Sequence, residues 1–184
     1  LRAVGVAVVA VGVDIEADAV GATARSLDEE GVDAGTGGTH HLICADALEL
    51  DWSSLGSFDI VIGNPPFLSQ LATSTSRGGA SDRGGGPYAD AAAEFVALAG
   101  EIVDPNGGRV AMVLPQSLLS ARDAGPIRAT FDERASLVWS WWTGERVFDA
   151  NVYTCALMFE FGTPSPNPDA WSRVITDRQG VPDV

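Results

Sequence analysis

The sequence contains no lysine, and its charge is strongly one-sided. Its eleven basic residues are all arginines, and twenty-five acidic residues give a net charge of −14. A domain that binds nucleic acid by itself typically carries a basic patch or stripe, and a net charge of this sign is the opposite of that pattern. Acidic domains still act on nucleic acid where another domain supplies the phosphate contacts. The charge therefore argues against a self-sufficient nucleic-acid binder and leaves the chemistry of the chain open.

Cysteine and histidine are scarce, with two residues of each. Cys44 and Cys155 lie in separate apolar, strand-like segments without CxxC or His-rich spacing. This predicts buried free thiols in a reducing compartment, and so a cytoplasmic protein. His40 and His41 precede a strand and have no evident metal partners, so we expect a solvated loop there and no metal site.

Long apolar runs and an initiating methionine are also absent. No apolar run approaches the roughly 20 residues that span a membrane, and no signal peptide is visible. The 184 residues, 46% of them hydrophobic, suit one globular domain with a real core. The opening Leu-Arg-Ala-Val suggests a fragment or a partial reading frame.

The stretch 58–67 carries the strongest signal. Its first residues, Phe-Asp-Ile-Val-Ile-Gly, are typical of a short buried strand, and Asn64-Pro65-Pro66-Phe67 follows. The two prolines fix φ and have no N–H, and Pro66 holds Pro65 extended. A stiff loop at the strand's carboxyl end thus presents an amide side chain, a free carbonyl and an aromatic ring. Open α/β sheets bind ligands at such ends.

This group of atoms suits the capture of a planar amine. The side-chain oxygen of Asn64 and the carbonyl of Pro65 are two acceptors for the two hydrogens of an exocyclic NH₂. Holding both hydrogens aims the nitrogen lone pair outward, and Phe67 can stack on the ring, worth roughly 1–3 kcal/mol. Such a site favours attack by a poor nucleophile on an electrophilic methyl group through alignment and electrostatics. The alternative is a rigid turn that merely ends a strand.

Asn-Pro-Pro-Phe after an apolar strand resembles the catalytic signature of S-adenosylmethionine-dependent N6-adenine DNA methyltransferases, the N-6 DNA methylase group of restriction-modification systems. The resemblance implies a Rossmann-like α/β fold, a mostly parallel sheet with an antiparallel edge pair. It implies that Asn64 and Pro65 hold the amino group of a flipped adenine, that Phe67 stacks on it, and that Pro66 fixes the loop. The cofactor implied is S-adenosyl-L-methionine.

Two acids that follow apolar strands are the candidate cofactor residues. Asp14 ends the strand 8–15, ahead of a helix expected over 17–30 with Gly31 as its stop. An acid there suits ribose hydroxyls, and the alternative is a cap of that helix. Asp46 follows a strand over 41–44, and the alternative for it is a turn former. By resemblance Asp14 binds the ribose, Ile15 lies against the adenine, and Asp46-Ala47 form the next cofactor segment.

A polar, Gly-rich loop follows the signature over 68–87. So long a loop in a compact domain is usually functional or disordered. Arg77 and Arg83 are candidate DNA-binding residues that would meet phosphates beside the flipped base. A solvated loop without such contacts is the equal alternative.

The remaining chain continues the alternation of helices and strands. We expect further elements at these positions: a helix over 88–103, a strand over 109–115, a helix over 123–133, and antiparallel strands over 135–142 and 153–161. The cluster Trp139, Trp141 and Trp142 is interpreted as packing at the sheet edge. Residues 1–161 would form the catalytic domain, 162–170 a Pro-rich linker, and 171–184 the start of a following region.

The resemblance covers roughly residues 8–161. The family's first strand and its Gly-rich cofactor turn would precede residue 1, and a target-recognition domain would follow residue 170. That first strand is central, between the strand ending at Asp14 and the strand ending at Ile62. The expected fragment would therefore have a gap in its sheet, and we expect it to be inactive alone.

Two other functions fit parts of the pattern. An RNA guanine-N2 or protein-glutamine methyltransferase shares the tetrapeptide, although the glutamine enzymes typically end it in Tyr, so Phe67 favours nucleic acid. A non-catalytic subunit that retains the fold is the other. The predicted partners are DNA and a specificity or target-recognition domain or subunit, with no membrane and no metal.

Overall fold

The computed structural model describes residues 8–29, 39–67, 83–86, 91–142, 144, 152–162 and 164. The chain divides into two compact units, Leu1–Asp51 and Trp52–Val184. The one domain expected over 1–161 therefore comprises two units. The expected linker and following region lie almost wholly outside the described residues.

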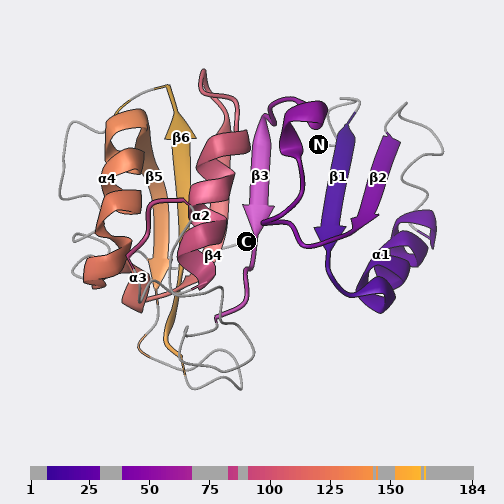
Figure 1. Ribbon diagram of the computed structural model, residues 1–184, viewed down its shortest axis with the longest axis horizontal. Coiled ribbons are helices and arrows are strands. Elements are labelled where there is room, and N and C mark those ends of the chain that lie inside the picture. The colour runs from indigo at the N-terminus through magenta and orange to yellow at the C-terminus, as the bar shows by residue number, and fades with distance from the viewer. Residues whose placement is uncertain are drawn as a thin grey trace. The chain divides into compact units, whose positions relative to one another are not determined.

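The first unit is a strand–helix–strand motif (Figure 1). Strand β1 (Val9–Asp14) pairs in parallel with β2 (Thr39–Cys44), and helix α1 (Ala17–Glu29) connects them. The half-buried positions of α1 recur with a helical period and include the apolar residues Ala19, Val20, Ala24 and Leu27. The strand and helix expected here are thus confirmed.

Strand β2 starts earlier than expected, which corrects the interpretation of the histidines. His40 and His41 lie inside β2, where they pair with Ala10 and Val11, and not in a solvated loop. The first residues of β2 are polar, so the sequence did not indicate a strand there. One face of this two-stranded sheet is accessible, and polar side chains are tolerated at the alternating positions that face it. Among the described residues no group of three His, Cys, Asp or Glu side chains is arranged to hold a metal ion.

The second unit is built on a four-stranded mixed sheet with the order β3-β4-β6-β5. Strands β3 (Ile60–Gly63) and β4 (Arg109–Pro115) are parallel, whereas β6 (Thr154–Phe161) runs antiparallel to β4 and to β5 (Ala135–Trp142). The expected antiparallel pair at the edge is confirmed. A one-residue irregularity interrupts the β5–β6 pairing between Leu137 and Trp139.

Helices α2 (Ala91–Ile102) and α4 (Gly125–Arg134) cover one face of this sheet (Figure 1). On that face β4 presents Val110, Met112 and Leu114, all buried, while the intervening Arg109, Ala111 and Val113 are exposed or half-buried. Short helices α3 (Ser117–Ser120) and η3 (Arg122–Ala124) join β4 to α4. A 3-10 turn, η2 (Trp52–Leu55), precedes β3.

Aromatic rings close the core between α4 and β6. Phe131 of α4 makes edge-on contacts with Phe159 at 5.0 Å and with Phe161 at 5.2 Å between ring centroids. Such geometry adds to the area that the rings bury. This core fixes α4 and, through the α2–α4 contact, the helix layer as a whole.

Strand β3 differs from the fully buried strand expected from its apolar run. Val61 packs against the core, but Ile62 is 79% exposed and Ile60 is also exposed. Among the described residues β3 pairs with β4 and not with β1, so the described strands form two separate sheets. The strand β3 carries apolar side chains on both of its faces, but among the described residues only the face with Val61 packs against other side chains.

None of the described helices combines the length and the apolar character needed to cross a membrane.

Candidate active site

The loop Asn64-Pro65-Pro66-Phe67 leaves the carboxyl end of β3, as expected. Asn64 and Pro66 are exposed, Pro65 is buried, and Phe67 is half-buried and packs against the hydrophobic core. The backbone approaches β4 closely before the loop, since a Cβ added at Gly63 would lie 2.6 Å from Sδ of Met112. An anchored ring and a buried proline thus hold an exposed amide side chain.

Helix α2 begins at the same edge of the sheet. Its carboxyl end is tied to the chain before β3, because Phe58 donates to the Ile102 carbonyl at 2.9 Å and Asp104 donates to the Phe58 carbonyl at 2.9 Å. The helix therefore runs back along β3, and its buried first-turn residues Ala92 and Ala93 belong to the core against which Phe67 packs. This packing explains why the ring of Phe67 is only partly accessible.

The candidate cofactor residues lie together at one edge of the first unit. Parallel pairing sets Asp14 beside Cys44, so Asp14-Ile15 and Asp46-Ala47 follow the carboxyl ends of adjacent strands. Asp14 and Ile15 are exposed, Ile15 by 65%. Asp46 and Ala47 are half-buried. Both acids therefore lie at the same edge of the two-stranded sheet, and the ligand that they would bind remains a prediction.

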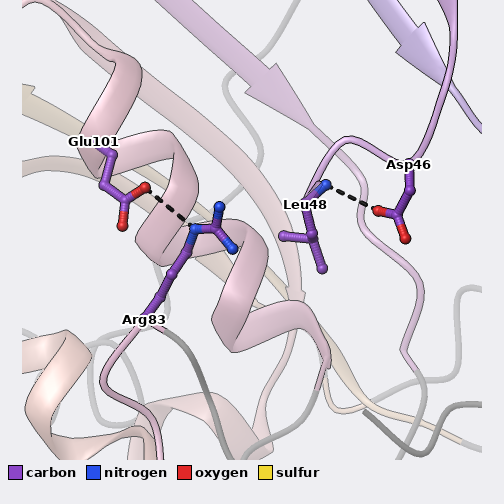
Figure 2. Close-up of polar contacts among 4 residues, drawn as sticks. All are labelled: Asp46, Leu48, Arg83 and Glu101. Carbon is purple, nitrogen blue, oxygen red and sulfur yellow. Dashed lines mark hydrogen bonds and ion pairs between the residues drawn. The ribbon is translucent and has the colours of Figure 1, made fainter. Parts of the chain in front are cut away.

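Both carboxylates also shape their own turns. The Glu16 N–H donates to Oδ1 of Asp14 at 2.8 Å, and the Leu48 N–H donates to Oδ1 of Asp46 at 2.9 Å, as Figure 2 shows for the second pair. Side chains of Asp commonly accept from the backbone two residues on. The hydrogen bonds therefore agree with the alternative roles given above, a helix cap for Asp14 and a turn former for Asp46. A ligand bound by Asp14 would use mainly its other oxygen.

Arg83 makes an ion pair with α2. Its Nε lies 3.2 Å from Oε2 of Glu101 (Figure 2), and the segment is further fixed where Gly86 donates to the Asp123 carbonyl at 2.8 Å. Arg77 lies outside the described residues. A phosphate contact by either arginine remains a prediction, and for Arg83 the phosphate would compete with Glu101.

The edge of the sheet that carries Asn64 also carries three residues without a predicted role, Gln116, Tyr153 and Thr154. Gln116 follows β4, and its backbone N–H donates to the Tyr153 carbonyl at 2.9 Å, while its Nε2 donates to the Thr154 carbonyl at 3.1 Å. These bonds join the end of β4 to the start of β6. The bonds form only because β4 and β6, which are distant in sequence, pair in the fold. From the sequence alone, the only sign for Gln116 is its position directly after the strand expected over 109–115.

Burial perturbs two ionisable groups in the second unit. It raises the pKa of the Cys155 thiol to about 12. It lowers the pKa of the Arg128 guanidinium, which nearby Asp132 opposes. Nη1 of Arg128 donates to the Leu118 and Ala121 carbonyls, at 2.7 and 2.8 Å, so this cation ties α4 to α3.

The two cysteines differ, which corrects half of the expectation for them. Both are free, and Cys155 is buried as expected, but Cys44 is exposed. Cys44 ends β2, and its Sγ donates to the Ile15 carbonyl at 3.6 Å. An apolar strand end is not covered here because it lies at the sheet edge beside Asp14.

Comparison with known proteins identifies the family and the fold of the chain. The family model of the Eco57I restriction-modification methylase matches residues 10–148. No significant match was found among curated proteins. The M protein of the type I restriction enzyme EcoKI is 25% identical with a TM-score of 0.62, covering 87% of this chain and 32% of that one.

A second solved structure supports the same fold. The methyltransferase subunit of a type I restriction-modification system from Streptococcus thermophilus is 20% identical with a TM-score of 0.64. The match covers 85% of this chain and 34% of that one, and at this identity it bears on the fold alone. The chain spans about a third of the length of these two proteins. The expected Rossmann-like methyltransferase fold is confirmed.

Proposed function

Because the chain belongs to the Eco57I restriction-modification methylase family, we propose that it carries the catalytic residues of an adenine-specific DNA methyltransferase. The reaction moves a methyl group from S-adenosyl-L-methionine to the N6 amino group of adenine. Asn64 and Pro65 accept hydrogen bonds from that amino group, Pro66 keeps the loop extended, and Phe67 contacts the base.

One observation carries this proposal: the rigid presentation of Asn64. The residue is exposed, although Pro65 on one side is buried and Gly63 on the other packs against Met112. A side chain that only ends a strand needs no such support. Preorganised acceptors aimed at a reacting nitrogen act without reorganisation at the moment of reaction.

The chemistry needs alignment more than a strong base. Two acceptors on the amine hydrogens hold the nitrogen out of conjugation with the ring and point its lone pair at the methyl group. Transfer would break the C–S bond, whose electron pair would stay on the sulfur of S-adenosylhomocysteine, and would form the N–C bond. The Asn64 and Pro65 oxygens would stabilise the positive charge that develops on the nitrogen, which would then lose one proton to solvent. Holding the partners in line supplies the rest of the rate.

The proposed cofactor site is the edge of the first unit. Asp14 accepts from ribose hydroxyls with the oxygen that Glu16 does not use, and the exposed Ile15 lies against the adenine ring. Asp46 and Ala47 contact the adenine from the next strand. S-adenosyl-L-methionine supplies the electrophilic methyl group.

The proposed partners follow from charge and length. With a net charge of −14, the chain needs phosphate contacts from elsewhere. We assign these to a target-recognition domain or subunit, with Arg77 and Arg83 as local phosphate contacts. Residues 1–161 are the proposed catalytic domain, 162–170 a linker and 171–184 the start of a further region.

The test compares two asparagine variants in the complete encoded protein that contains residues 1–184. Asn64→Ala should lower N6-methyladenine formation by at least roughly 10²-fold, comparable to losing one preorganised contact. Cofactor affinity should change little. The control is Asn106→Ala, the same chemical change at an exposed turn before β4, the opposite end of the sheet.

Near-normal methylation by Asn64→Ala would remove the proposal. The same assay offered RNA or protein in place of DNA distinguishes the guanine-N2 and glutamine methyltransferases. A protein that binds no cofactor would be a non-catalytic subunit.

A further inference from the structure

We propose that Met112 is a positioning residue for the methyl transfer, because its thioether fills the space beside Gly63 and so sets the position of the Asn64 amide. The proposal rests on the proposed function, since it concerns the group that would hold the target amine. Met112 lies on β4, in a segment to which the sequence assigned no role in the site. It acts through the loop after β3 and contacts neither the base nor the cofactor.

Strand register sets Met112 directly beside the last residue of β3. Gly63 pairs with Met112 in the parallel ladder, so the two residues face the same side of the sheet. That side is the one that the helices cover, because Val61 packs against the core and Met112 is only 7% exposed. The exposed Ile62 lies between Val61 and Gly63 and faces the other side.

The thioether of Met112 occupies the volume that a side chain at Gly63 would need. A Cβ at Gly63 would lie 2.6 Å from Sδ and 3.1 Å from Cε of Met112, whereas ordinary contact begins at 3.4 Å. The same Cβ position lies 3.9 Å from Cδ of Pro65. Met112 therefore lies against the backbone at the point where β3 becomes the loop.

The thioether has little room to move away. Met112 belongs to the buried cluster that includes Ala92, Ala93 and Leu114, and Phe67 of the loop packs against that cluster. Protein interiors are close-packed, so a displaced group passes the strain to its neighbours. An unbranched methionine suits the irregular gap that a glycine leaves in such a core.

The stiff loop passes a shift at Gly63 on to Asn64. Gly63 adjoins Asn64, and the two prolines that follow restrict the backbone, so few torsions can absorb a displacement. To reach ordinary contact, a Cβ at Gly63 would have to move 0.8 Å further from Sδ, the difference between 3.4 and 2.6 Å. Misplacing a reacting group by about 1 Å can cost about 10²-fold in rate.

The experiment exchanges volume between the two residues in the complete encoded protein. Gly63→Ala should lower kcat for adenine methylation about 10²-fold at saturating cofactor and DNA. Adding Met112→Val removes Sδ and Cε, keeps a residue that favours strands, and should restore kcat by at least about 10-fold. Affinity for S-adenosyl-L-methionine should stay within about twofold in both variants, because a positioning defect lowers kcat and not binding.

The control is Gly100→Ala, at a similarly crowded glycine of the same core. A Cβ there would lie 2.9 Å from Cε2 of Phe131, but Gly100 lies near the carboxyl end of α2, at the edge of the sheet away from Asn64. This variant should melt at a lower temperature and, below that temperature, keep kcat within about twofold. A role of Met112 in stability alone would make Gly63→Ala behave in the same way.

Met112→Val alone replaces Gly63→Ala if thermal melting shows that the latter is unfolded. The gap that it leaves beside Gly63 frees the loop, so kcat should fall about 10-fold while cofactor affinity holds. An unchanged kcat would refute the proposal.

Isotope-labelled methionine methyl groups report the contact without activity. The 184 residues contain two methionines, and they face opposite sides of the sheet, because Met112 pairs with Leu157 and the next residue, Met158, pairs with Ala111. Gly63→Ala, and DNA that contains the target adenine, should each shift the Met112 methyl signal and leave that of Met158 in place. A Met112 signal that neither moves would refute the proposal.

The outcomes separate the inference from the proposed function. If the unsubstituted protein methylates adenine and Gly63→Ala behaves like Gly100→Ala, Met112 does not position Asn64, and the proposed function stands. If Gly63→Ala is inactive and Met112→Val restores nothing, the loss does not run through Met112, and the inference again fails alone. If the unsubstituted protein binds cofactor but methylates no adenine, the proposed function fails and the inference falls with it.

Discussion

At the scale of single residues, burial divides chemically identical groups. The thiol of Cys155 lies on β6 inside the core, whereas that of Cys44 is exposed at the end of β2. The thiolate is the reactive form of cysteine, and an apolar environment disfavours it. The two thiols should therefore report separately on the two units.

We expect one fast and one protected thiol in the native protein. A chromogenic disulfide reagent at pH 8 should titrate Cys44 at once and Cys155 only as the chain unfolds. Cys44→Ser should remove the fast phase, and Cys155→Ser the slow one. Equal rates for both thiols in the native state would contradict the burial of Cys155.

The same thiol predicts a loss of stability in alkali. Its pKa rises from the ordinary 9.0 to about 12 on folding, so its contribution is fully present below pH 9. Between pH 9 and 12 the unfolded thiol ionises and the folded one does not, which lowers the free energy of unfolding by up to about 1.4 kcal/mol per pH unit. Cys155→Ser should flatten this part of a denaturation profile, and an unchanged slope would count against the assignment.

Asp14 allows a test of the proposed cofactor site. Asp14→Asn can still accept from the Glu16 N–H, so the turn should survive, but it loses the charge that strengthens bonds from ribose hydroxyls. Affinity for S-adenosyl-L-methionine should fall about 10-fold, or about 1.4 kcal/mol. Asp28→Asn, on the exposed end of α1, is the matched control. Equal affinities in a titration calorimeter would return Asp14 to a purely structural role.

At the scale of elements, the contact between α2 and α4 depends on a glycine. A Cβ added at Gly100 would lie 2.9 Å from Cε2 of Phe131, which is held by Phe159 and Phe161. In α1, by contrast, a Cβ at Gly21 would meet only Arg25 at an ordinary 3.7 Å. There is thus room for a methyl group at Gly21 and none at Gly100.

We expect opposite signs from the same substitution at these positions. Gly21→Ala should raise the free energy of unfolding by about 0.5–1 kcal/mol through helix propensity. Gly100→Ala gains the same propensity but overpacks the core, which typically costs about 1–3 kcal/mol, so a net loss is expected. Urea denaturation of the two variants would measure both, and stabilisation by Gly100→Ala would show that Phe131 can move aside.

Elements also show what local sequence can and cannot predict. The bounds of β4 (Arg109–Pro115) and β5 (Ala135–Trp142) follow directly from their apolar runs and flanking residues. The loop after Gly63 was likewise predictable, because two prolines restrict the chain without any tertiary contact. The exposed isoleucines of β3 and the strand position of His40 were not, since they depend on which neighbours cover or pair each strand.

The candidate site likewise has a part that could be predicted from the sequence and a part that could not. Asn64, Asp14 and Asp46 each follow a strand, so their placement at sheet edges could be inferred from sequence. The hydrogen bonds from Gln116 to the Tyr153 and Thr154 carbonyls could not be inferred, because only the antiparallel pairing of β4 with β6 brings these residues together. Side-chain pairing across the sheet carries information that no single segment holds.

At the scale of the whole molecule, the two units are unequally buried. Unit two has a continuous core drawn from α2, β4, α4 and β6. In the first unit no residue of α1 is buried, and β1 and β2 form a sheet of two strands. Small sheets of this kind are marginal alone. Most of the free energy of folding should therefore reside in unit two.

Hydrogen exchange should reveal this inequality. Amides of Val11 and Val13 on β1 should exchange at least about 100-fold faster than those of Leu114 on β4 and Leu157 on β6, a difference of about 2.7 kcal/mol in opening free energy. Adding S-adenosyl-L-methionine should slow exchange in β1 and β2, because a ligand that binds only the folded state stabilises it by mass action. Uniform exchange would show that the units unfold as one, and protection confined to β3 and β4 would move the cofactor site away from Asp14.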